Sequence, residues 1–165
     1  MPEMAHSGAA TVTLPGDTQI LITREFNAPP HLVYKAWTTP ELVKRWWNAK
    51  RGEVTAAEID LRVGGRWRYV MVTEDGMEVG FHGEYLEIVP NERIVSTEVF
   101  EGIPDGEAQA STNTLTLTEA DGRTTLTILV EHKSKEGRDA QIDSGMEAGL
   151  QDALDLLEQV AMSLR

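Results

Sequence analysis

The sequence contains no cysteine, and this absence excludes disulfide bonds, thiolate nucleophiles and cysteine-ligated metals. Such a composition is typical of a reducing compartment, so we expect a cytoplasmic location. Long hydrophobic runs are also missing, since no apolar stretch approaches the roughly 18 residues of a transmembrane helix. The N-terminal residues lack the basic segment and apolar stretch of a signal peptide, so neither membrane insertion nor secretion is expected.

Positive charge is scarce in this chain. Lys and Arg number 15 and Asp and Glu number 27, which gives a formal net charge of -12 at pH 7. Nucleic acids and anionic membrane surfaces bind through clusters of basic side chains, so neither is an expected partner. The 165 residues, of which 41% are hydrophobic, suit one globular domain. We expect a flexible N-terminal tail over residues 1–16 and a single domain over residues 17–165.

Alternating apolar residues predict an antiparallel sheet in the middle of the chain. Short turns such as Glu74-Asp75-Gly76 join neighbouring segments, and short connections favour antiparallel pairing. Two short helices are expected after the first strand, one from Pro30 and one from Pro40, because proline is favoured in the first helical turn. The predicted strands are seven in number and cover residues 18–26, 54–60, 66–73, 78–89, 93–100, 111–118 and 123–133.

The C-terminal residues predict one long amphipathic helix. Ser144 and Glu147 stand at the spacing of a capping box, with Ser144 as the N-cap. Apolar residues then recur at steps of three and four as far as Leu164, which gives a stripe about twenty residues long. A straight helix laid across a twisted sheet cannot contact it everywhere, so we expect an enclosed apolar space between the two.

Four segments carry distinctive motifs. They are residues 22–30, the Arg45-Trp46-Trp47 run, residues 60–67 with the sequence D-L-R-V-G-G-R-W, and Gly83-Glu84-Tyr85. In these motifs the chain resembles the activator of heat-shock protein 90 ATPase homologue-like family, over about residues 18–164. The resemblance implies an α+β fold, the START-like helix-grip fold of the SRPBCC superfamily. In that fold a seven-stranded curved antiparallel sheet wraps around a long C-terminal helix, with two short helices after the first strand.

The last helix departs from the family pattern at one place. Relatives often carry Gly-Trp at the position where this chain has Gly149-Leu150. Without the tryptophan, the space beside the expected cavity is either larger or occupied by another side chain.

A set of residues is predicted to line the space between sheet and helix and to bind a ligand there. They lie on inner strand faces, on the helical stripe or at the end of the second short helix: Trp47, Trp67, Tyr69, Met71, Phe81, Ile128, Val130, His132, Met146, Leu150 and Leu154. Tyr69 and His132 stand out, because a buried phenol needs a hydrogen-bond partner and an imidazole titrates near pH 7. Packing in an ordinary core is the competing interpretation.

No metal, cofactor or catalytic nucleophile is predicted. His82-Gly83-Glu84 and Glu131-His132 are the local histidine–carboxylate pairs, and neither has a further ligand at helical spacing. His82 is expected on the outer face of its hairpin. No nucleophile elbow or phosphate loop occurs, since Gly64-Gly65 is a turn. Asp60 and Arg62 are expected to pair beside that turn.

The leading hypothesis is a protein that binds a hydrophobic or amphipathic small molecule between the sheet and the last helix. Residues 101–110 and 134–143 contain glycine and few apolar side chains, so we expect them to be mobile and to act as lids. The resemblance implies an alternative, a stress-related co-chaperone-like module that contacts a heat-shock protein 90. A third possibility is a cyclase-like or hydrolase-like enzyme using His132 and Tyr69. A monomer or homodimer is expected.

Overall fold

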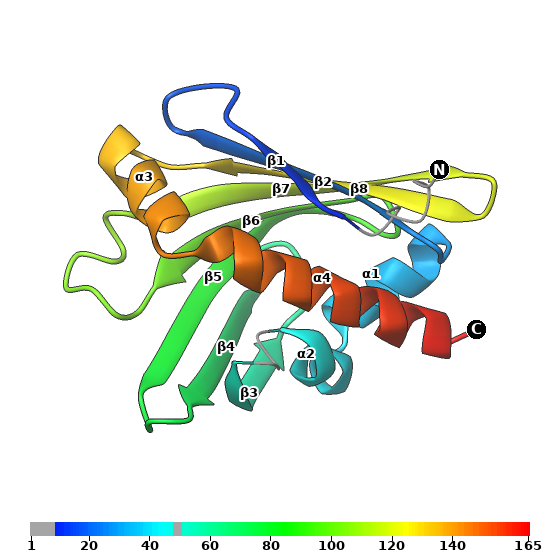
Figure 1. Cartoon of the computed structure of the whole chain (residues 1–165), viewed down its shortest axis with the longest axis horizontal. Coiled ribbons are helices and arrows are strands. Elements are labelled where there is room, and N and C mark those ends of the chain that lie inside the picture. Colours follow the sequence, from blue (N-terminus) through cyan, green and yellow to red (C-terminus); the bar gives the residue numbers. More distant parts are fainter. Residues whose placement is uncertain (1–8, 48–50) are drawn as a thin grey trace.

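The computed structural model describes residues 9–47 and 51–165, which form one antiparallel sheet with a long helix packed on it (Figure 1). In this part of the chain the eight strands are β1 (Thr11–Thr13), β2 (Gln19–Phe26), β3 (Gly52–Ile59), β4 (Arg66–Thr73), β5 (Glu78–Val89), β6 (Arg93–Phe100), β7 (Ser111–Ala120) and β8 (Arg123–Glu131). Their order across the sheet is β1-β2-β8-β7-β6-β5-β4-β3. The beginning of the chain therefore pairs with the last strand.

Four helices accompany the sheet in the described residues. They are α1 (Pro30–Thr38), α2 (Pro40–Trp46), α3 (Lys135–Asp143) and α4 (Met146–Ser163). α4 runs across one face of the sheet, and α1, α2 and α3 all pack against it (Figure 1). Pro30 and Pro40 each stand in a first helical turn, where a missing N–H costs no hydrogen bond. The order of elements confirms the predicted helix-grip fold.

The core lies on the face of the sheet that meets α4. Leu126, Ile128 and Val130 of β8 are buried while the residues between them are partly exposed, which is the alternation of a half-buried strand. The register sets Ile20 and Ile22 of β2 opposite Val130 and Ile128. From α4 the core includes Leu154, Leu157, Val160 and Ala161.

A buried cation fixes α4 on β2. The Arg24 side chain is 1% exposed, and its terminal nitrogens donate to Asp155 Oδ1 at 2.9 Å and Glu158 Oε1 at 2.8 Å. The other oxygen of Glu158 accepts the backbone N–H of Asn27 at 2.7 Å, and the guanidinium carbon lies 4.9 Å from the centre of the Phe26 ring. A buried charge has to be paired, so these contacts determine where α4 crosses the sheet.

The sheet has eight strands in the described residues instead of the predicted seven. The additional strand is β1, which lies within the predicted tail. Thr11–Thr13 pair with β2, so a flexible tail is the wrong prediction for these residues. Beside them, the backbone of buried Ala10 exchanges hydrogen bonds of 3.0 and 2.9 Å with the Gln151 side chain of α4. Three residues are too few to show a period, and the helical partner lies 141 residues later in the chain. Residues 1–8 of the predicted tail lie outside the described residues.

The segment before α4 is also corrected, because it is a docked helix rather than an irregular lid. α3 occupies most of residues 134–143, and its Arg138 is buried. The Arg138 guanidinium donates to the backbone carbonyl oxygens of Gly16 at 2.9 Å and Gln19 at 3.2 Å. α3 is therefore attached to the chain at the loop between β1 and β2 and the start of β2. The polar sequence of α3 does not predict this long-range contact.

The boundary between α3 and α4 differs from the predicted capping box. Ser144 ends α3, and its hydroxyl donates to the carbonyl oxygen of Gln141 at 2.6 Å. Gly145 is the N-cap of α4 with a φ of 81°, a left-handed conformation that favours glycine. The chain thus turns sharply between two helices instead of entering α4 from an extended serine.

Candidate functional site

The predicted binding residues divide into a core group and a group near β4 and β5. Ile128, Val130 and Leu154 are buried among other apolar side chains of the core. Met146 and Leu150, on the first turns of α4, are partly buried and pack against that core. Ligand contact by the fully enclosed residues stays a prediction, while the second group has a more distinctive geometry.

Five aromatic side chains form a continuous series on the inner face of β4, β5 and β6, which we call the aromatic row. Trp47, just after α2, has its ring centre 5.3 Å from that of Tyr69 and 5.9 Å from that of Phe81, both edge-on. Tyr69 lies 4.8 Å from Trp67, and Phe81 lies 5.2 Å from Phe100. Trp67 and Tyr69 are buried, whereas Phe100 is 39% exposed. The aromatic row therefore runs from the core to the surface.

Gly83 makes room for the innermost ring. It pairs with Trp67 across β4 and β5, and a Cβ atom on it would lie 1.9 Å from the Thr97 carbonyl oxygen and 2.5 Å from Trp67 Nε1. The Trp67 Nε1–H instead donates to that carbonyl oxygen at 3.2 Å. One indole thus joins β4 to β6 across β5, and Met71, also predicted for the site, is buried farther along β4.

A carboxyl group and an amide lie on the same inner face. Glu98 of β6 accepts a hydrogen bond from Asn113 Nδ2 of β7 at 2.6 Å. Ile94 and Leu115, at alternate positions of the same strands, belong to the core, so Glu98 and Asn113 share its face. Burial raises the pKa of Glu98, and the hydrogen bond from Asn113 opposes this rise. No ion pair to Glu98 occurs within residues 9–47 and 51–165.

Two polar atoms near Glu98 lack hydrogen-bond partners in the described part of the chain. Asn113 Oδ1 is buried without one, and the hydroxyl of Tyr69, a residue 7% exposed, makes no hydrogen bond either. The pKa of Tyr69 is raised well above its ordinary value, chiefly by burial and further by Tyr85 and Glu98, so Glu98 is near enough to act on the phenol. We call Tyr69, Glu98 and Asn113 the inner polar group.

The sequence interpretation missed Phe100, Glu98 and Asn113. A signal was present for the polar pair, because each lies at an even spacing from a core residue of its strand, Glu98 from Ile94 and Asn113 from Leu115. Phe100 offered a weaker signal, since it is the last residue of β6 and directly precedes an acidic loop.

His132 is bound to neighbouring elements at the end of β8. Its Nε2 lies 2.5 Å from Gln141 Oε1 of α3, and its backbone N–H donates to the Thr18 carbonyl oxygen at 2.8 Å. The imidazole thus has a hydrogen-bond partner within the fold, as a structural histidine does. Its contact with a ligand stays a prediction.

Arg51 lies beside α4 at the position where the sequence departs from the family pattern. A Cβ atom on Gly149 would be 3.0 Å from the Arg51 guanidinium carbon. The next residue, Leu150, packs against the core. The glycine therefore leaves space that a cation takes up.

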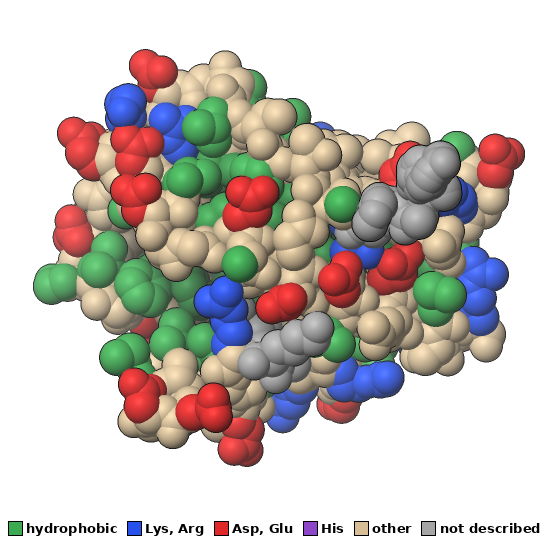
Figure 2. Space-filling view, in the orientation of Figure 1, with side chains coloured by type: hydrophobic (Ala, Val, Ile, Leu, Met, Phe, Trp, Pro, Cys, Tyr) green, Lys and Arg blue, Asp and Glu red, His purple; other side chains and the backbone are tan. Residues whose placement is uncertain are grey.

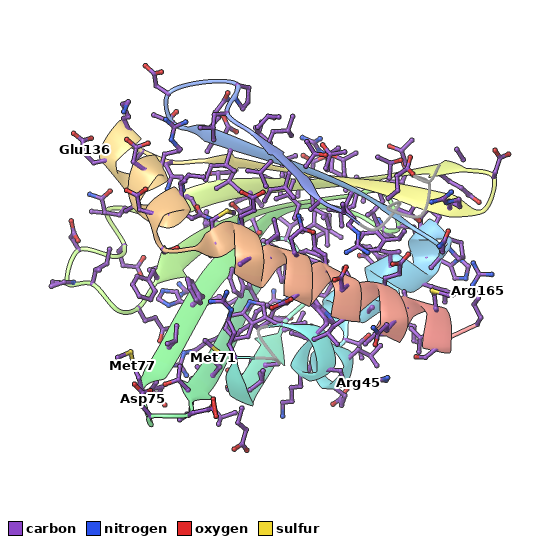
Figure 3. The ribbon with its side chains drawn as sticks, viewed as in Figure 1. Arg45, Met71, Asp75, Met77, Glu136 and Arg165 are labelled. Carbon is purple, nitrogen blue, oxygen red and sulfur yellow. The ribbon has the colours of Figure 1, made fainter. Side chains whose placement is uncertain are left out.

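The outer end of the aromatic row reaches the surface at one end of the molecule. Figure 2 shows hydrophobic side chains on the left of the view, over the area where Figure 1 places β5, β6 and the loop after β6. Phe100 and Ile103, 39% and 40% exposed, belong to this part. Figure 3 marks the same end by Met77 in the β4–β5 turn and Glu136 on α3, while Arg165 lies at the opposite end.

Two surface depressions of the described chain lie elsewhere. One of about 630 Å³ is bounded by the start of α1, the β5–β6 turn and β7, and one of about 170 Å³ lies beside the β7–β8 turn. Neither is between the sheet and α4, so a cavity at that place stays a prediction. The described residues include no group of three or more side chains suited to a metal ion. None of the helices in the described ranges combines the length and apolar character that crossing a membrane requires.

His82 lies on the outer face of the sheet, as expected from the sequence, and it is the centre of an ion-pair network there. His82 Nδ1 lies 2.7 Å from Glu101 Oε2, and its Nε2 lies 2.7 Å from Glu107 Oε2. Glu101 also accepts hydrogen bonds of 3.0 and 2.9 Å from Arg68. Glu107 and Glu101 raise the pKa of His82, and Arg68 is the main cause that lowers the pKa of Glu101 to about 2. Residues 101–110 are thus attached to the sheet at two points.

We expect this attachment to weaken as pH rises. The folded-state pKa of His82 lies above its ordinary 6.5, so its contribution is fully present below about pH 6.5 and is lost as pH passes the raised value. An NMR titration should show the His82 ring and the amides of residues 101–110 responding together. His82→Gln should remove that response and cost less than about 1 kcal/mol of stability, because surface ion pairs are screened. A measured His82 pKa of 6.5 or below would contradict the network.

Comparisons with known proteins agree with this fold. The family described as Activator of Hsp90 ATPase homolog 1-like protein matches residues 27–162. A Rhodobacter sphaeroides protein of known structure superposes with a TM-score of 0.85 at 24% identity, covering 93% of this chain and 99% of that one. A Mycobacterium smegmatis protein gives 0.81 at 27% identity, with 92% and 96% covered. A Chromobacterium violaceum protein gives 0.76 at 29% identity, with 88% and 98% covered.

The comparison with curated proteins gives no match. The family match spans most of the chain and includes both short helices, every strand from β3 to β8 and nearly all of α4. The chain therefore belongs to the Activator of Hsp90 ATPase homolog 1-like family and has its START-like helix-grip fold.

Proposed function

We propose that this protein binds a hydrophobic or amphipathic small molecule on the inner face of β4, β5 and β6, beside the first turns of α4. The observation that carries the proposal is that the aromatic row leads from exposed Phe100 to buried Tyr69, next to an inner polar group with unpartnered atoms. Small-molecule sites commonly combine aromatic walls with a few polar groups that orient the ligand.

Trp47 is the ring on which the proposal depends most. It bridges Tyr69 and Phe81, and it is partly exposed. Its backbone N–H donates to the Val43 carbonyl oxygen at 2.9 Å, which fixes its main chain at the end of α2, and the edge-on contacts with Tyr69 and Phe81 hold the ring. A ring held in this way loses little conformational freedom when a ligand packs against it.

Replacing Trp47 by Ala should lower affinity for an apolar aromatic probe about tenfold. Each aromatic contact contributes about 0.5–1.5 kcal/mol beyond its buried area, and Trp47 supplies a large flat face. Naphthylethanol is a suitable probe, and isothermal titration calorimetry measures its binding. Leu86→Ala is the control, because Leu86 is 45% exposed on a neighbouring position of β5 and outside the aromatic row.

Equal affinities for Trp47→Ala and the unaltered protein would place the probe elsewhere and count against the proposed site. Native mass spectrometry of the purified protein adds a direct check, since a bound natural molecule should appear as a mass increment that Trp47→Ala lowers. The family description also suggests contact with a chaperone of the heat-shock protein 90 type. That alternative rests on the description alone and predicts no effect of Trp47 on probe binding.

A further inference from the structure

The inner polar group offers more hydrogen-bond acceptors than donors, since the Tyr69 hydroxyl is its one unused donor group among the described residues. An ionised carboxylate accepts several hydrogen bonds, and Glu98 receives one from the described residues, at 2.6 Å from Asn113 Nδ2. Asn113 Oδ1 is a second buried acceptor, and it receives none from them. A buried acceptor without a partner, such as Asn113 Oδ1, is costly, so a group that donates hydrogen bonds is favoured at this place.

We propose that the site takes an amphipathic amine, whose protonated nitrogen donates to Glu98 and Asn113 Oδ1 while its hydrocarbon or aromatic part lies against the aromatic row. This inference rests on the proposed function and names the class of its ligand. An ammonium group carries three donors and no acceptor, which complements the acceptors of Glu98 and Asn113 and also suits the oxygen of the Tyr69 hydroxyl.

Three further features favour a cation at this position. The rings of Trp47, Trp67 and Tyr69 follow one another within 5.3 Å between centres, and the faces of such rings attract cations. Glu98 is only partly exposed, and its contact among the described residues is the hydrogen bond from Asn113 with no cation, although a desolvated carboxylate is ordinarily paired with a positive charge. The formal net charge of -12 also raises the local concentration of small cations around the protein.

The competing arrangement has a protonated Glu98, which donates one hydrogen bond to a neutral or anionic ligand. A carboxylic acid kept neutral by burial would favour an alcohol or a carboxylate over an amine. The two arrangements therefore predict opposite orders of affinity for ligands that share one hydrocarbon part.

Three probes of matched shape separate these arrangements. Naphthylethylamine, naphthylethanol and naphthylacetate should be titrated by calorimetry at neutral pH and physiological ionic strength, where nonspecific attraction to the acidic surface is screened. We expect the amine to bind at least tenfold more tightly than the alcohol, and the carboxylate to bind most weakly. Glu98→Gln should weaken the amine about tenfold to hundredfold and leave the alcohol within a factor of about three.

Glu98→Gln is expected to fold, because a glutamine oxygen can still accept the Asn113 N–H. Glu84→Gln is the matched control, since Glu84 is an exposed carboxylate on β5 and its loss changes net charge equally. Comparable binding of all three probes, with no effect of Glu98→Gln, would overturn the amine inference and leave the proposed function standing. Absence of saturable binding by every probe would instead reject the proposed function. Equal weakening of the amine by Glu84→Gln would show attraction to the surface and also overturn the inference.

Discussion

Removal of both carboxylates that pair with Arg24 is expected to lower the free energy of unfolding by about 3–5 kcal/mol, because a buried cation is left uncompensated. The Asp155→Ala/Glu158→Ala variant leaves a guanidinium with a 1% exposed side chain and no carboxylate within the described contacts. It also removes the acceptor of the Asn27 backbone N–H. For a chain of this length the melting temperature should fall by roughly 10–15 °C, which calorimetry or circular dichroism measures.

The matched control removes two carboxylates that make no ion pair among the described residues. Glu53 and Glu84 are exposed on β3 and β5, so Glu53→Ala/Glu84→Ala changes net charge equally and should alter the melting temperature by only a few degrees. Adding Arg24→Met to the destabilised variant should recover most of the loss, since an apolar side chain of similar length needs no partner. If Arg24→Met brings no recovery, the loss does not come from an unpaired buried charge.

The elements predicted correctly from the sequence are those whose pattern is contained in one short segment. Proline at the start of α1 and α2, period-two alternation in β2 and β8, and the stripe of α4 all depend on residues within one short segment. The expected pair beside the Gly64-Gly65 turn is also confirmed, with Arg62 Nε 2.9 Å from Asp60 Oδ2. Local patterns suffice in these cases because the spacing of the apolar residues matches the period of a single helix or strand.

The parts that were missed depend on partners far away in the sequence. β1 exists because Thr11–Thr13 pair with β2 and Gln151 satisfies the backbone of Ala10, and α3 is docked through Arg138. From the sequence pattern, arginines such as Arg24 and Arg138 are expected to be exposed to solvent. Both are buried, because other elements supply the acceptors for their guanidinium groups.

The candidate site divides in the same way. The aromatic positions Trp67, Tyr69 and Phe81 were predicted on strands and Trp47 at the end of the second short helix, and the structure brings them together. Glu98 and Asn113 were not predicted, because a polar side chain on the inner face violates the alternation on which the prediction relied. Such violations are expected where function rather than stability selects the residue.

The second large effect is expected at Gly83. In Gly83→Ala the added Cβ would meet the Thr97 carbonyl oxygen at 1.9 Å and Trp67 Nε1 at 2.5 Å, so β5 and β6 have to separate or the indole has to leave. Overpacking of this kind costs about 1–3 kcal/mol, and loss of the Trp67–Thr97 hydrogen bond adds about 1 kcal/mol. The melting temperature should fall by roughly 10 °C.

Gly80→Ala is the control for Gly83→Ala, because it adds the same atom to the same strand. Its nearest contact, at 2.5 Å, is the carboxylate end of Glu101, a side chain that can move aside, whereas Gly83 faces backbone. The loss in Gly80→Ala should therefore stay below about 1 kcal/mol, within the range of ordinary surface changes. Since Trp67 is the inner end of the aromatic row, Gly83→Ala should also weaken naphthylethanol binding when measured well below its melting temperature. Equal melting temperatures for the two variants would show that the indole does not depend on the space above Gly83, and that close packing does not require a glycine at that position.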